Sequence, residues 1–467
     1  MNLIHELQGQ WRHNDNCIKN EFITIRYSQL GNYFEELDGL VDLRDIPSNA
    51  CFRLYFQNSP VDVLVLMYLL SKNVNVFISG KEESPTFCSH SIAIDQKRLK
   101  ESDWSLNDVV QLSELNIKDY PLKQNQCVIV ETSGSTGSSK FVLFSKTNFL
   151  YNSKHVLSRI NILNQDNVFI SVPCYHMYGL GAALLPSLIA GASIHMLGNY
   201  NIIKYTEYSR AFEPTIVFQA PSMINMLTEL SGAAQKYKLS IVAGDKTDKS
   251  RWVAYEEKFG MLINLYGSTE LGVIATSIVT DEPALKHDGY LSFLDTVEPQ
   301  WKPLDEDKFL LEIKHPYSFD TYMDSLGMPI QIESKSPSKD GWFPSNDVCA
   351  RKGSNRFLLL DRYDNTVNRN GKLISFNEIE RKVEHGIEAV QKSIVIAGDR
   401  NSIRGRELVL FYQMKDGENV DLDVRKACFK LMNRDYVPDV AICLTEFPKL
   451  PNGKINRMKL KEELSSR

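Results

Sequence analysis

Apolar residues along the chain gather in short runs that alternate with longer helical patterns from about residue 50 onward. FRLYFQ at 52–57 and VNVFISG at 74–80 are typical of buried strands, and VDVLVLMYLLSK at 61–72 is typical of a helix, so the three predict a βαβ unit. The alternation returns between residues 166 and 267 in DNVFISVP, GLGAALLPSLIAG, ASIHML, TIVFQA, PSMINMLTEL, KLSIVAG and MLINLYG. Because these strands are largely apolar, the pattern predicts a layered α/β domain with mostly parallel, buried sheets.

The pattern changes toward the C-terminus. Residues 305–345 are more charged and carry shorter strands such as FLLEIK, which favours an antiparallel or mixed sheet. In the last hundred residues, GKLISFNEIERKVEHGI and VRKACFKLMNRDYV indicate helices, and SIVIAG and ELVLFYQM indicate strands. We therefore expect a large α/β domain over 1–361 and a small α+β domain over 362–467. The polar stretch DRYDNTVNRNGK at 361–372 is the expected hinge.

Composition narrows the class of protein. A chain of 467 residues is too long for one compact core. A net charge of −5 leaves no basic footprint for binding nucleic acid, and the eight cysteines form no CxxC pair, which favours reduced thiols. The N-terminus lacks the pattern of a signal peptide, and the longest apolar run, 61–70, is about half the length that spans a bilayer. We expect a cytoplasmic protein with no integral membrane association.

The segment ETSGSTGSSKFVLFSK at 131–146 has the composition of a loop that wraps phosphates. Gly134 and Gly137 allow the backbone to approach an anion closely, and Lys140 adds a positive charge. Backbone N–H groups could donate to phosphate oxygens together with the hydroxyls of Thr132, Ser133, Ser135, Thr136, Ser138 and Ser139. The spacing does not match a Walker A loop. A flexible Ser/Gly linker is the alternative, but the strand-like flanks favour a turn between two buried strands.

NLYGSTELG at 264–272 follows a predicted strand, which is where open α/β sheets bind ligands. The Tyr266 ring could stack on a heteroaromatic base, and Gly267 permits close approach. Thr269 offers a hydroxyl and Glu270 an oxygen ligand for Mg²⁺. An ordinary turn at a strand end is the alternative.

Three further segments carry candidate residues. His176 lies in PCYHMYGLG beside Tyr178, where it could line a pocket, although a single histidine is more often structural. Asp347 ends GWFPSND, and its carboxylate could accept both ribose hydroxyls; the alternative for it is a solvated surface carboxylate. Lys454 follows an Asn-Gly turn in LPNGKINR, and the alternative for it is a solvated surface charge.

Taken in order, TSGSTGSSK, LYGSTE, DRYDNTVNRNG and PNGKINR resemble the motifs of the adenylate-forming superfamily. That superfamily comprises acyl- and aryl-CoA synthetases, peptide-synthetase adenylation domains and luciferases. The resemblance runs from about Ser48 to Lys459. It implies that a carboxylate attacks the α-phosphate of ATP to give acyl-AMP and pyrophosphate, and that a thiol then takes the acyl group.

The resemblance also implies a role for each candidate. The Thr132–Lys140 loop would hold the β- and γ-phosphates, Thr269 would contact the α-phosphate, and Glu270 would support Mg²⁺. Tyr266 would stack on adenine, and Asp347 and Arg362 would hold the ribose.

Lys454 would bridge the acid and the reacting phosphate before the small domain rotates about a hinge at Asp364. Rotation would bring the 365–373 loop, with Gly371, to the site. His176 would gate the thiol tunnel and contact the acid.

The chain departs from the family pattern at several positions. Ser139 stands where proline usually precedes the loop lysine, Asp361 replaces a glycine and Asn365 replaces an aspartate. The Gly-rich segment that normally lies between LYGSTE and Asp347 is reduced. None of these changes removes a charged group from the implied chemistry.

Relatives that activate amino acids commonly carry Phe-Asp where this chain has Phe218-Gln219, so an acid without a free amine is favoured. AGDK at 243–246 matches a segment near the adenine and acyl pocket, and Asp245 could bind a polar substituent or be solvated. Aryl and fatty acids both suit an apolar pocket, and we favour an aryl acid. The residues expected to line this pocket are His176, Tyr178, Phe218, Ala243 and Gly244.

The expected acceptor is CoA or the phosphopantetheine of a separate acyl or peptidyl carrier protein, because no carrier motif is apparent in the chain. Two other classes remain open. One is a relative that binds nucleotide without catalysis, and the other is a phosphotransferase that cleaves ATP at the γ-phosphate. The presence of Lys140, Glu270, Asp347 and Lys454 together counts against a non-catalytic relative.

Overall fold

The structure is a computed structural model. It describes residues 11–44, 46–101, 103–115, 121–132, 140–197, 201–230, 235–244, 249–277, 286–305, 307–332, 336–353, 355–369, 372–402, 405–415, 423–449 and 455–465. In these ranges, none of the helices combines the length and the apolar character that crossing a membrane requires. The chain divides into two compact units, one of Met1–Glu298 with Lys314–Gly341 and one of Pro299–Ile313 with Trp342–Arg467.

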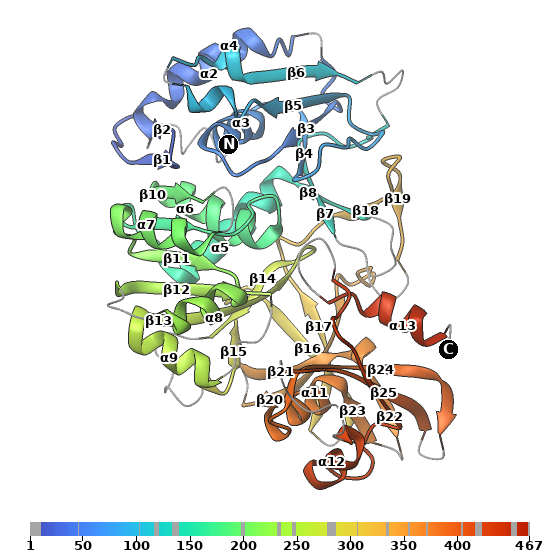
Figure 1. The fold of residues 1–467 in the computed structure, drawn as a ribbon. Helices are drawn as coiled ribbons and strands as arrows, with labels where there is room; N and C mark the ends of the chain where they lie inside the picture. The colour runs from blue at the N-terminus through green and yellow to red at the C-terminus, as the bar shows by residue number, and fades with distance from the viewer. Residues whose placement is uncertain are drawn as a thin grey trace. The chain divides into compact units, whose positions relative to one another are not determined.

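The first unit contains a large, mostly parallel sheet with the strand order β15-β14-β13-β12-β11-β9-β10-β1-β2 (Figure 1). The strands from β13 to β1 run parallel, and β2, β14 and β15 are antiparallel to their neighbours. The bounds are β1 Cys17–Lys19, β2 Thr24–Arg26, β9 Asn167–Ile170, β10 Ser193–Met196, β11 Ile216–Gln219, β12 Tyr237–Ala243, β13 Gly260–Ser268, β14 Gly272–Thr276 and β15 Tyr290–Phe293. The predicted parallel α/β sheet is therefore confirmed.

A second sheet of the first unit has the strand order β19-β18-β8-β7-β4-β3-β5-β6. Strands β3 and β4 are parallel and α3 connects them, which confirms the predicted βαβ unit. The bounds are β3 Cys51–Tyr55, β4 Asn75–Ser79, β5 His90–Ile94, β6 Val110–Glu114, β7 Cys127–Thr132, β8 Lys140–Ser145, β18 Thr321–Met323 and β19 Pro329–Ile330.

Helix α3 illustrates how the sequence specifies an element. Pro60 occupies its first turn, and the side chains of Ser59 and Asp62 cap its N-terminus reciprocally. Its residues are apolar on all sides, and most of them are fully buried. The helices of this unit are η1 Tyr27–Gln29, α2 Leu30–Leu40, α3 Pro60–Ser71, η2 Arg98–Lys100, α4 Leu106–Val109, α5 Lys146–Ile160, the π-helix η3 Tyr178–Leu184, α6 Leu185–Ala190, α7 Ile202–Phe212, α8 Pro221–Glu229 and α9 Lys249–Phe259.

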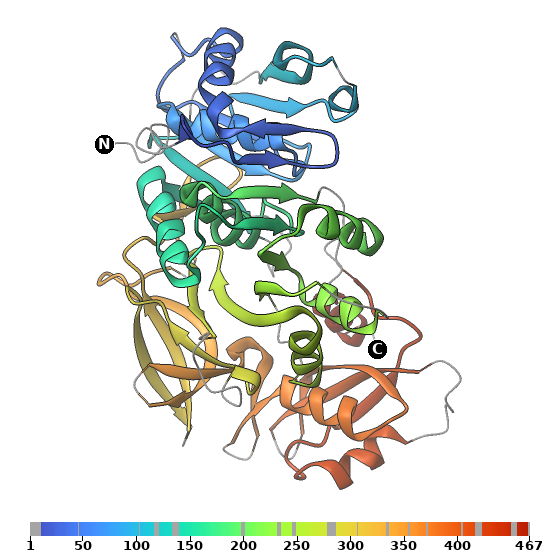
Figure 2. The same cartoon turned by 90° about the vertical axis from the view of Figure 1, so that its left-hand side faces the viewer.

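The second unit contains the antiparallel strands β17, β20 and β21 with β16 beside β17, as the charged segment after residue 305 predicts. It also contains a sheet of order β23-β22-β25-β24, with β26 beside β25. Helices α11 and α12 pack on that sheet (Figure 2). The elements are β16 Glu298–Asp305, β17 Lys308–Lys314, β20 Phe343–Lys352, β21 Arg356–Arg362, η4 Tyr363–Asn365, β22 Thr366–Arg369, β23 Lys372–Ser375, α11 Phe376–Gly386, β24 Val390–Ser402, β25 Gly405–Met414, α12 Val424–Leu431, β26 Val440–Cys443 and α13 Arg457–Ser465.

The polar stretch expected as a joint is largely regular structure. Thr366–Arg369 form β22, which pairs with β23, because Val367 alternates with polar residues and its side chain is buried. The proposed boundary after residue 361 concerns a rotation between domains and stays a prediction.

Candidate functional site

The carboxyl ends of four neighbouring strands, β9, β11, β12 and β13, carry most of the candidate residues of the first unit. From β9 the chain enters β10 on one side and later β11 on the other, so strand order reverses at β9. Open α/β sheets bind ligands at such a reversal. Phe218 lies near the end of β11, Ala243 ends β12 and Tyr266 lies near the end of β13. The fold thus brings these distant segments to one edge of the sheet.

The segment after β9 carries His176 and is held by Asn58. The Oδ1 atom of Asn58 accepts from the Cys174 backbone N–H at 2.8 Å, and its Nδ2 donates to the Val172 carbonyl at 3.2 Å. His176 is exposed, with its ring centroid 4.5 Å from that of Tyr175. Asn58 has a positive φ of 61° and sits in the turn before α3. Sequence reasoning missed Asn58, although an Asn-Ser-Pro series is a turn signal.

Gly179 explains how the helix after His176 can begin so close to this segment. A Cβ atom at Gly179 would lie 2.2 Å from the Pro173 carbonyl oxygen, so a larger residue would force the backbone apart. The π-helix η3 begins at the preceding residue, Tyr178. Short π-helical segments are frequent at functional sites.

Tyr178 spans the ends of two strands. Its hydroxyl contacts the Gln219 carbonyl of β11 at 3.1 Å and the Ile241 carbonyl of β12 at 2.9 Å. Burial raises the pKa of Tyr178 well above its usual range, so the hydroxyl stays protonated and can donate. Its ring centroid lies 6.3 Å from that of the fully buried Phe218. Two aromatic side chains therefore lie near each other at the strand ends, one half-buried and one fully buried.

The side chain of Gln219 is buried and engaged elsewhere. Its Oε1 atom accepts from the Tyr255 hydroxyl of α9 at 2.9 Å, and its Nε2 atom donates to the Tyr205 hydroxyl of α7. Successive residues of a strand face opposite sides of a sheet, so this amide lies on the other face from Phe218. Gln219 therefore belongs to a tyrosine network under the helices.

Gly244 and Gly267 owe their presence to different causes. Gly244 has a φ of +98°, which other residues rarely adopt, and a Cβ atom there would meet nothing within 4 Å. Register pairs the neighbouring Ala243 with Leu265, so Gly244 lies beside Tyr266. A Cβ atom at Gly267 would lie 2.2 Å from the Gly272 carbonyl oxygen. The close approach at Gly267 is therefore to the chain's own backbone.

Glu270 lies with Thr269 in the turn between β13 and β14, and both side chains are half-buried. The Tyr322 hydroxyl of β18 donates to Glu270 Oε1 at 2.7 Å, and the Phe319 N–H donates to the Glu270 carbonyl at 2.9 Å. Tyr322 is buried and comes from the second sheet, where no sequence motif marked it. The carboxylate is thus oriented by a residue far away in the chain.

A magnesium ion fits this carboxylate. Mg²⁺ is commonly bound through one or two carboxylates, with substrate phosphates and waters completing the shell. The described part of the chain holds no group of three His, Cys, Asp or Glu side chains able to bind a metal by themselves. An oriented single carboxylate suits an ion that arrives with a nucleotide.

The predicted phosphate loop joins two buried antiparallel strands, as expected from its flanks. Thr132 ends β7 and Lys140 begins β8, and the two residues are paired across the strands. Both side chains are half-buried. Several predicted residues lie outside the described residues, namely Ser133, Gly134, Ser135, Thr136, Gly137, Ser138, Ser139, Asp245, Gly371 and Lys454.

In the second unit, the two ribose candidates are neighbours. Asp347 on β20 is paired in register with Arg362 on β21, and Arg362 Nη1 lies 3.4 Å from Asp347 Oδ1. Asp347 is buried, whereas Arg362 is exposed. Asp364 lies exposed in the short helix η4.

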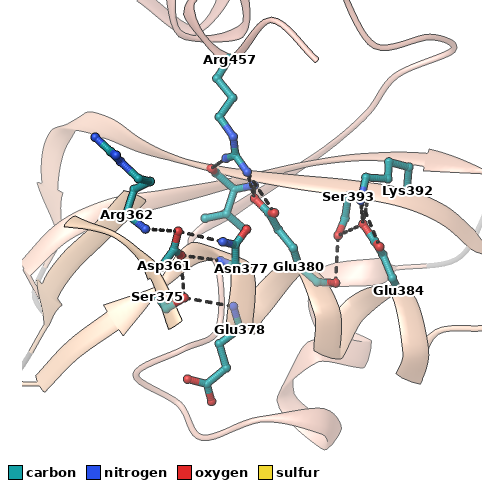
Figure 3. Close-up of polar contacts among 11 residues, drawn as sticks. Asp361, Arg362, Ser375, Asn377, Glu378, Glu380, Glu384, Lys392, Ser393 and Arg457 are labelled. Atoms are coloured by element: carbon teal, nitrogen blue, oxygen red, sulfur yellow. Dashed lines mark hydrogen bonds and ion pairs between the residues drawn. The ribbon is translucent and has the colours of Figure 1, made fainter. Parts of the chain in front are cut away.

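Asp361 has structural partners close by. Its carboxylate accepts from the Ser375 hydroxyl at 2.6 Å and from Asn377 Nδ2 at 2.8 Å (Figure 3). It also accepts from the Asn377 backbone N–H at 3.1 Å. The residue that replaces a glycine of the family pattern thus ties the end of β21 to the start of α11.

Comparison with known proteins identifies a family and related chains. A family model described as "AMP-binding enzyme" matches residues 58–295. The crotonobetaine/carnitine–CoA ligase of Salmonella typhimurium (strain LT2) is 23% identical over 352 residues, which cover 71% of this chain and 66% of that protein. The chain spans 14% to 66% of the length of the first curated relatives that it matches, less than two thirds.

Solved structures share the fold. ATP-bound MatB from Rhodopseudomonas palustris is 16% identical with a TM-score of 0.82, over 99% of this chain and 98% of that one. The o-succinylbenzoate CoA synthetase MenE from Bacillus subtilis, in complex with the acyl-adenylate intermediate OSB-AMP, is 16% identical with a TM-score of 0.79. That match covers 98% of both chains, and MenE has also been solved with ATP and a magnesium ion.

Proposed function

The chain belongs to the AMP-binding enzyme family, and we propose that it is an AMP-forming acid–thiol ligase. A carboxylate oxygen of the substrate attacks the α-phosphorus of ATP, the α–β phosphoanhydride bond breaks, and pyrophosphate leaves. A thiolate then attacks the acyl carbon, and AMP leaves. The observation that carries the proposal is the meeting of the His176, Phe218, Gly244 and Tyr266 segments at one edge of a parallel sheet.

The first step brings two anions together, so the site needs cations where negative charge accumulates. Lys140 and the loop from Thr132 to Gly137 would hold the β- and γ-phosphates, and Thr269 would donate to the α-phosphate. Mg²⁺, when bound, would neutralise phosphate charge, and Glu270 would hold it. Tyr322 supports this role because it orients the Glu270 carboxylate.

The remaining roles concern the nucleoside and the acid. Tyr266, with Gly244 and Gly267 beside it, would stack on adenine, and Asp347 with Arg362 would hold the ribose. His176 would contact the acid. Lys454 would bridge the acid and the reacting phosphate, and rotation about Asp364 would then withdraw it.

For the acid, we propose an aryl carboxylic acid. Support comes from the aromatic ring of Tyr178 at the strand ends, with the buried Phe218 near it, and from Gly244, where a Cβ atom would meet nothing within 4 Å. An amino acid is disfavoured because β11 carries no carboxylate to pair an ammonium, and the Gln219 amide is held by tyrosines. MenE, which shares the fold, holds an o-succinylbenzoyl adenylate. Fatty acids are the second class to test.

For the acceptor, we propose CoA, with the phosphopantetheine of a separate carrier protein as the alternative. Support comes from the curated relatives named as CoA ligases, of which the chain spans 66%. The cytoplasm stays the predicted compartment.

The proposal is tested by exchange of labelled pyrophosphate into ATP, run with aryl, fatty and amino acids and without any thiol. Exchange that depends on one class of acid, with AMP as the product once CoA is added, is the expected result. Formation of ADP would point to the phosphotransferase instead. If no acid supports pyrophosphate exchange while ATP still binds, a nucleotide-binding relative without catalysis would be favoured.

A Lys454→Ala variant separates the two half-steps. Pyrophosphate exchange should fall by about 10²-fold or more, because the variant loses a positioned charge at the reacting phosphate. Thioester formation from supplied acyl-AMP should be retained, since the lysine would be withdrawn during that step. Unchanged exchange would contradict the role of this lysine.

A further inference from the structure

Arg457, three residues after Lys454 in the sequence, forms an ion pair in the second unit. Arg457 begins α13, and its Nη2 atom lies 2.8 Å from Oε1 and 3.0 Å from Oε2 of Glu380 on α11 (Figure 3). Its Nη1 atom donates to the Val395 carbonyl of β24 at 2.8 Å. One guanidinium therefore joins the start of α13 to a helix and a strand.

The carboxylate of Glu380 is buried and bound to both Arg457 and β24. The side chain is 8% exposed, and Oε1 also accepts from the Val395 backbone N–H at 2.7 Å. Burial raises the pKa of Glu380, and the guanidinium of Arg457 opposes that rise by stabilising the carboxylate. Because a buried charge that loses its partner is strongly unfavourable, the pair favours the arrangement in which α13 begins beside α11 and β24.

The two flanks of the segment that contains Lys454 are also tied to each other. Lys449 and Ile455 form an antiparallel bridge, and the Asn456 N–H donates to the Pro448 carbonyl at 2.7 Å. Ile455 packs against a buried cluster that includes Phe447. The residues on the two sides of 450–454 therefore contact each other, and Arg457 connects them to α11 and β24.

We propose that Glu380 and Arg457 are positioning residues for Lys454, because they fix the point from which its segment departs. This inference rests on the proposed function. Neither residue needs to contact substrate. Loosening the anchor should impair the half-step that requires Lys454 and should spare the half-step from which Lys454 has been withdrawn.

The same helix and strand supply a matched control. Glu384 lies one turn further along α11, and its Oε1 atom accepts from the Ser393 N–H at 2.8 Å and lies 2.9 Å from Lys392 Nζ. These partners of Glu384 lie on β24 (Figure 3). Glu384→Gln therefore removes a comparable α11–β24 ion pair without touching the start of α13.

The experiment compares Glu380→Gln, Arg457→Lys and Glu384→Gln with the unmodified protein. Glu380→Gln keeps an acceptor for the Val395 N–H, and Arg457→Lys keeps the charge, so both variants are expected to fold. For Glu380→Gln, pyrophosphate exchange should fall about ten- to a hundredfold, while thioester formation from supplied acyl-AMP stays within about twofold. Arg457→Lys should retain more exchange than Glu380→Gln, and Glu384→Gln should behave like the unmodified protein.

Hydrogen exchange at the Asn456 amide gives a readout that does not depend on activity. It should be faster in Glu380→Gln than in Glu384→Gln. Equal amide exchange in the two variants would overturn the inference, as would a parallel loss of both half-steps or unchanged pyrophosphate exchange. If the unmodified protein catalyses no exchange with any acid, the proposed function fails, and the Asn456 amide still decides whether the anchor exists.

Discussion

Tyr322 carries the hydroxyl that orients Glu270, the proposed ligand for Mg²⁺. Partners that orient a metal ligand typically contribute about ten- to a hundredfold to metal affinity or activity. In Tyr322→Phe, we therefore expect the Mg²⁺ concentration for half-maximal pyrophosphate exchange to rise about tenfold. Tyr68→Phe is the matched control, because it removes a hydroxyl that donates to Asp38 at 2.8 Å. Equal magnesium dependence in the two variants would show that Tyr322 does not act through Glu270.

Asp62 couples the stability of α3 to pH. Burial raises its pKa from 3.8 to about 7, although Ser59 and Gln57 donate to the carboxylate. Because the folded-state pKa lies above the unfolded value, protonated Asp62 contributes its full stability below about pH 4. This contribution is lost as the pH rises toward 7. The loss amounts to at most about 1.4 kcal/mol for each pH unit in that window. Between pH 5 and 7.5, the unfolding temperature of the unmodified protein should therefore fall more than that of Asp62→Asn. Parallel curves of unfolding temperature against pH for the two proteins would contradict the raised pKa.

Single residues also mark the limit of what the sequence predicts. Glu270 and Asp347 were predicted because they lie in recognisable sequence motifs. In the structure, Glu270 accepts a hydrogen bond from Tyr322, and Asp347 lies beside Arg362. Asn58 and Tyr322 were missed, because their partners Cys174 and Glu270 lie 116 and 52 residues away along the chain. Contacts of this kind depend on how the sheets pack, which periodicity does not encode.

At the scale of elements, Asp361 links β21 to α11 through Ser375 and Asn377. If the small domain rotates about Asp364, these hydrogen bonds must break, since Asp364 lies between the linked residues. Asp361→Gly should therefore raise kcat a few-fold when domain rotation limits turnover. It should also lower the unfolding temperature, because hydrogen bonds to a charged group are worth about 1.5–3 kcal/mol.

The matched comparison is Ser375→Ala, which removes one of the same bonds and also the hydroxyl that accepts from the Glu378 N–H at 3.3 Å. It should destabilise the protein and raise kcat less than Asp361→Gly does. A fall in kcat in both variants would mean that the link supports activity rather than restrains rotation.

Elements were the most predictable scale. The strands and helices between residues 50 and 267 follow from apolar runs, and β9, β11, β12 and β13 form where they were expected. The stretch at 361–372 was read as a polar joint because of its many Asn and Asp residues. Part of it forms the strand β22 beside β23, and two of the four residues of β22, Val367 and Arg369, are buried.

At the scale of the whole molecule, the proposed function requires that the acid, ATP and the carboxylate of Glu270 meet at the strand ends of the first unit. Lys454 would act from a segment whose flank Glu380 and Arg457 hold. This arrangement matters only if ATP is attacked at its α-phosphorus.

The most direct test uses the acid identified by pyrophosphate exchange, labelled with ¹⁸O in its carboxylate, together with ATP and CoA. Attack on the α-phosphorus leaves one carboxylate oxygen on the phosphate, so we expect one ¹⁸O atom in the AMP released. Attack on the γ-phosphorus would instead place the label in inorganic phosphate and yield ADP. Label in phosphate, with none in AMP, would contradict the central claim.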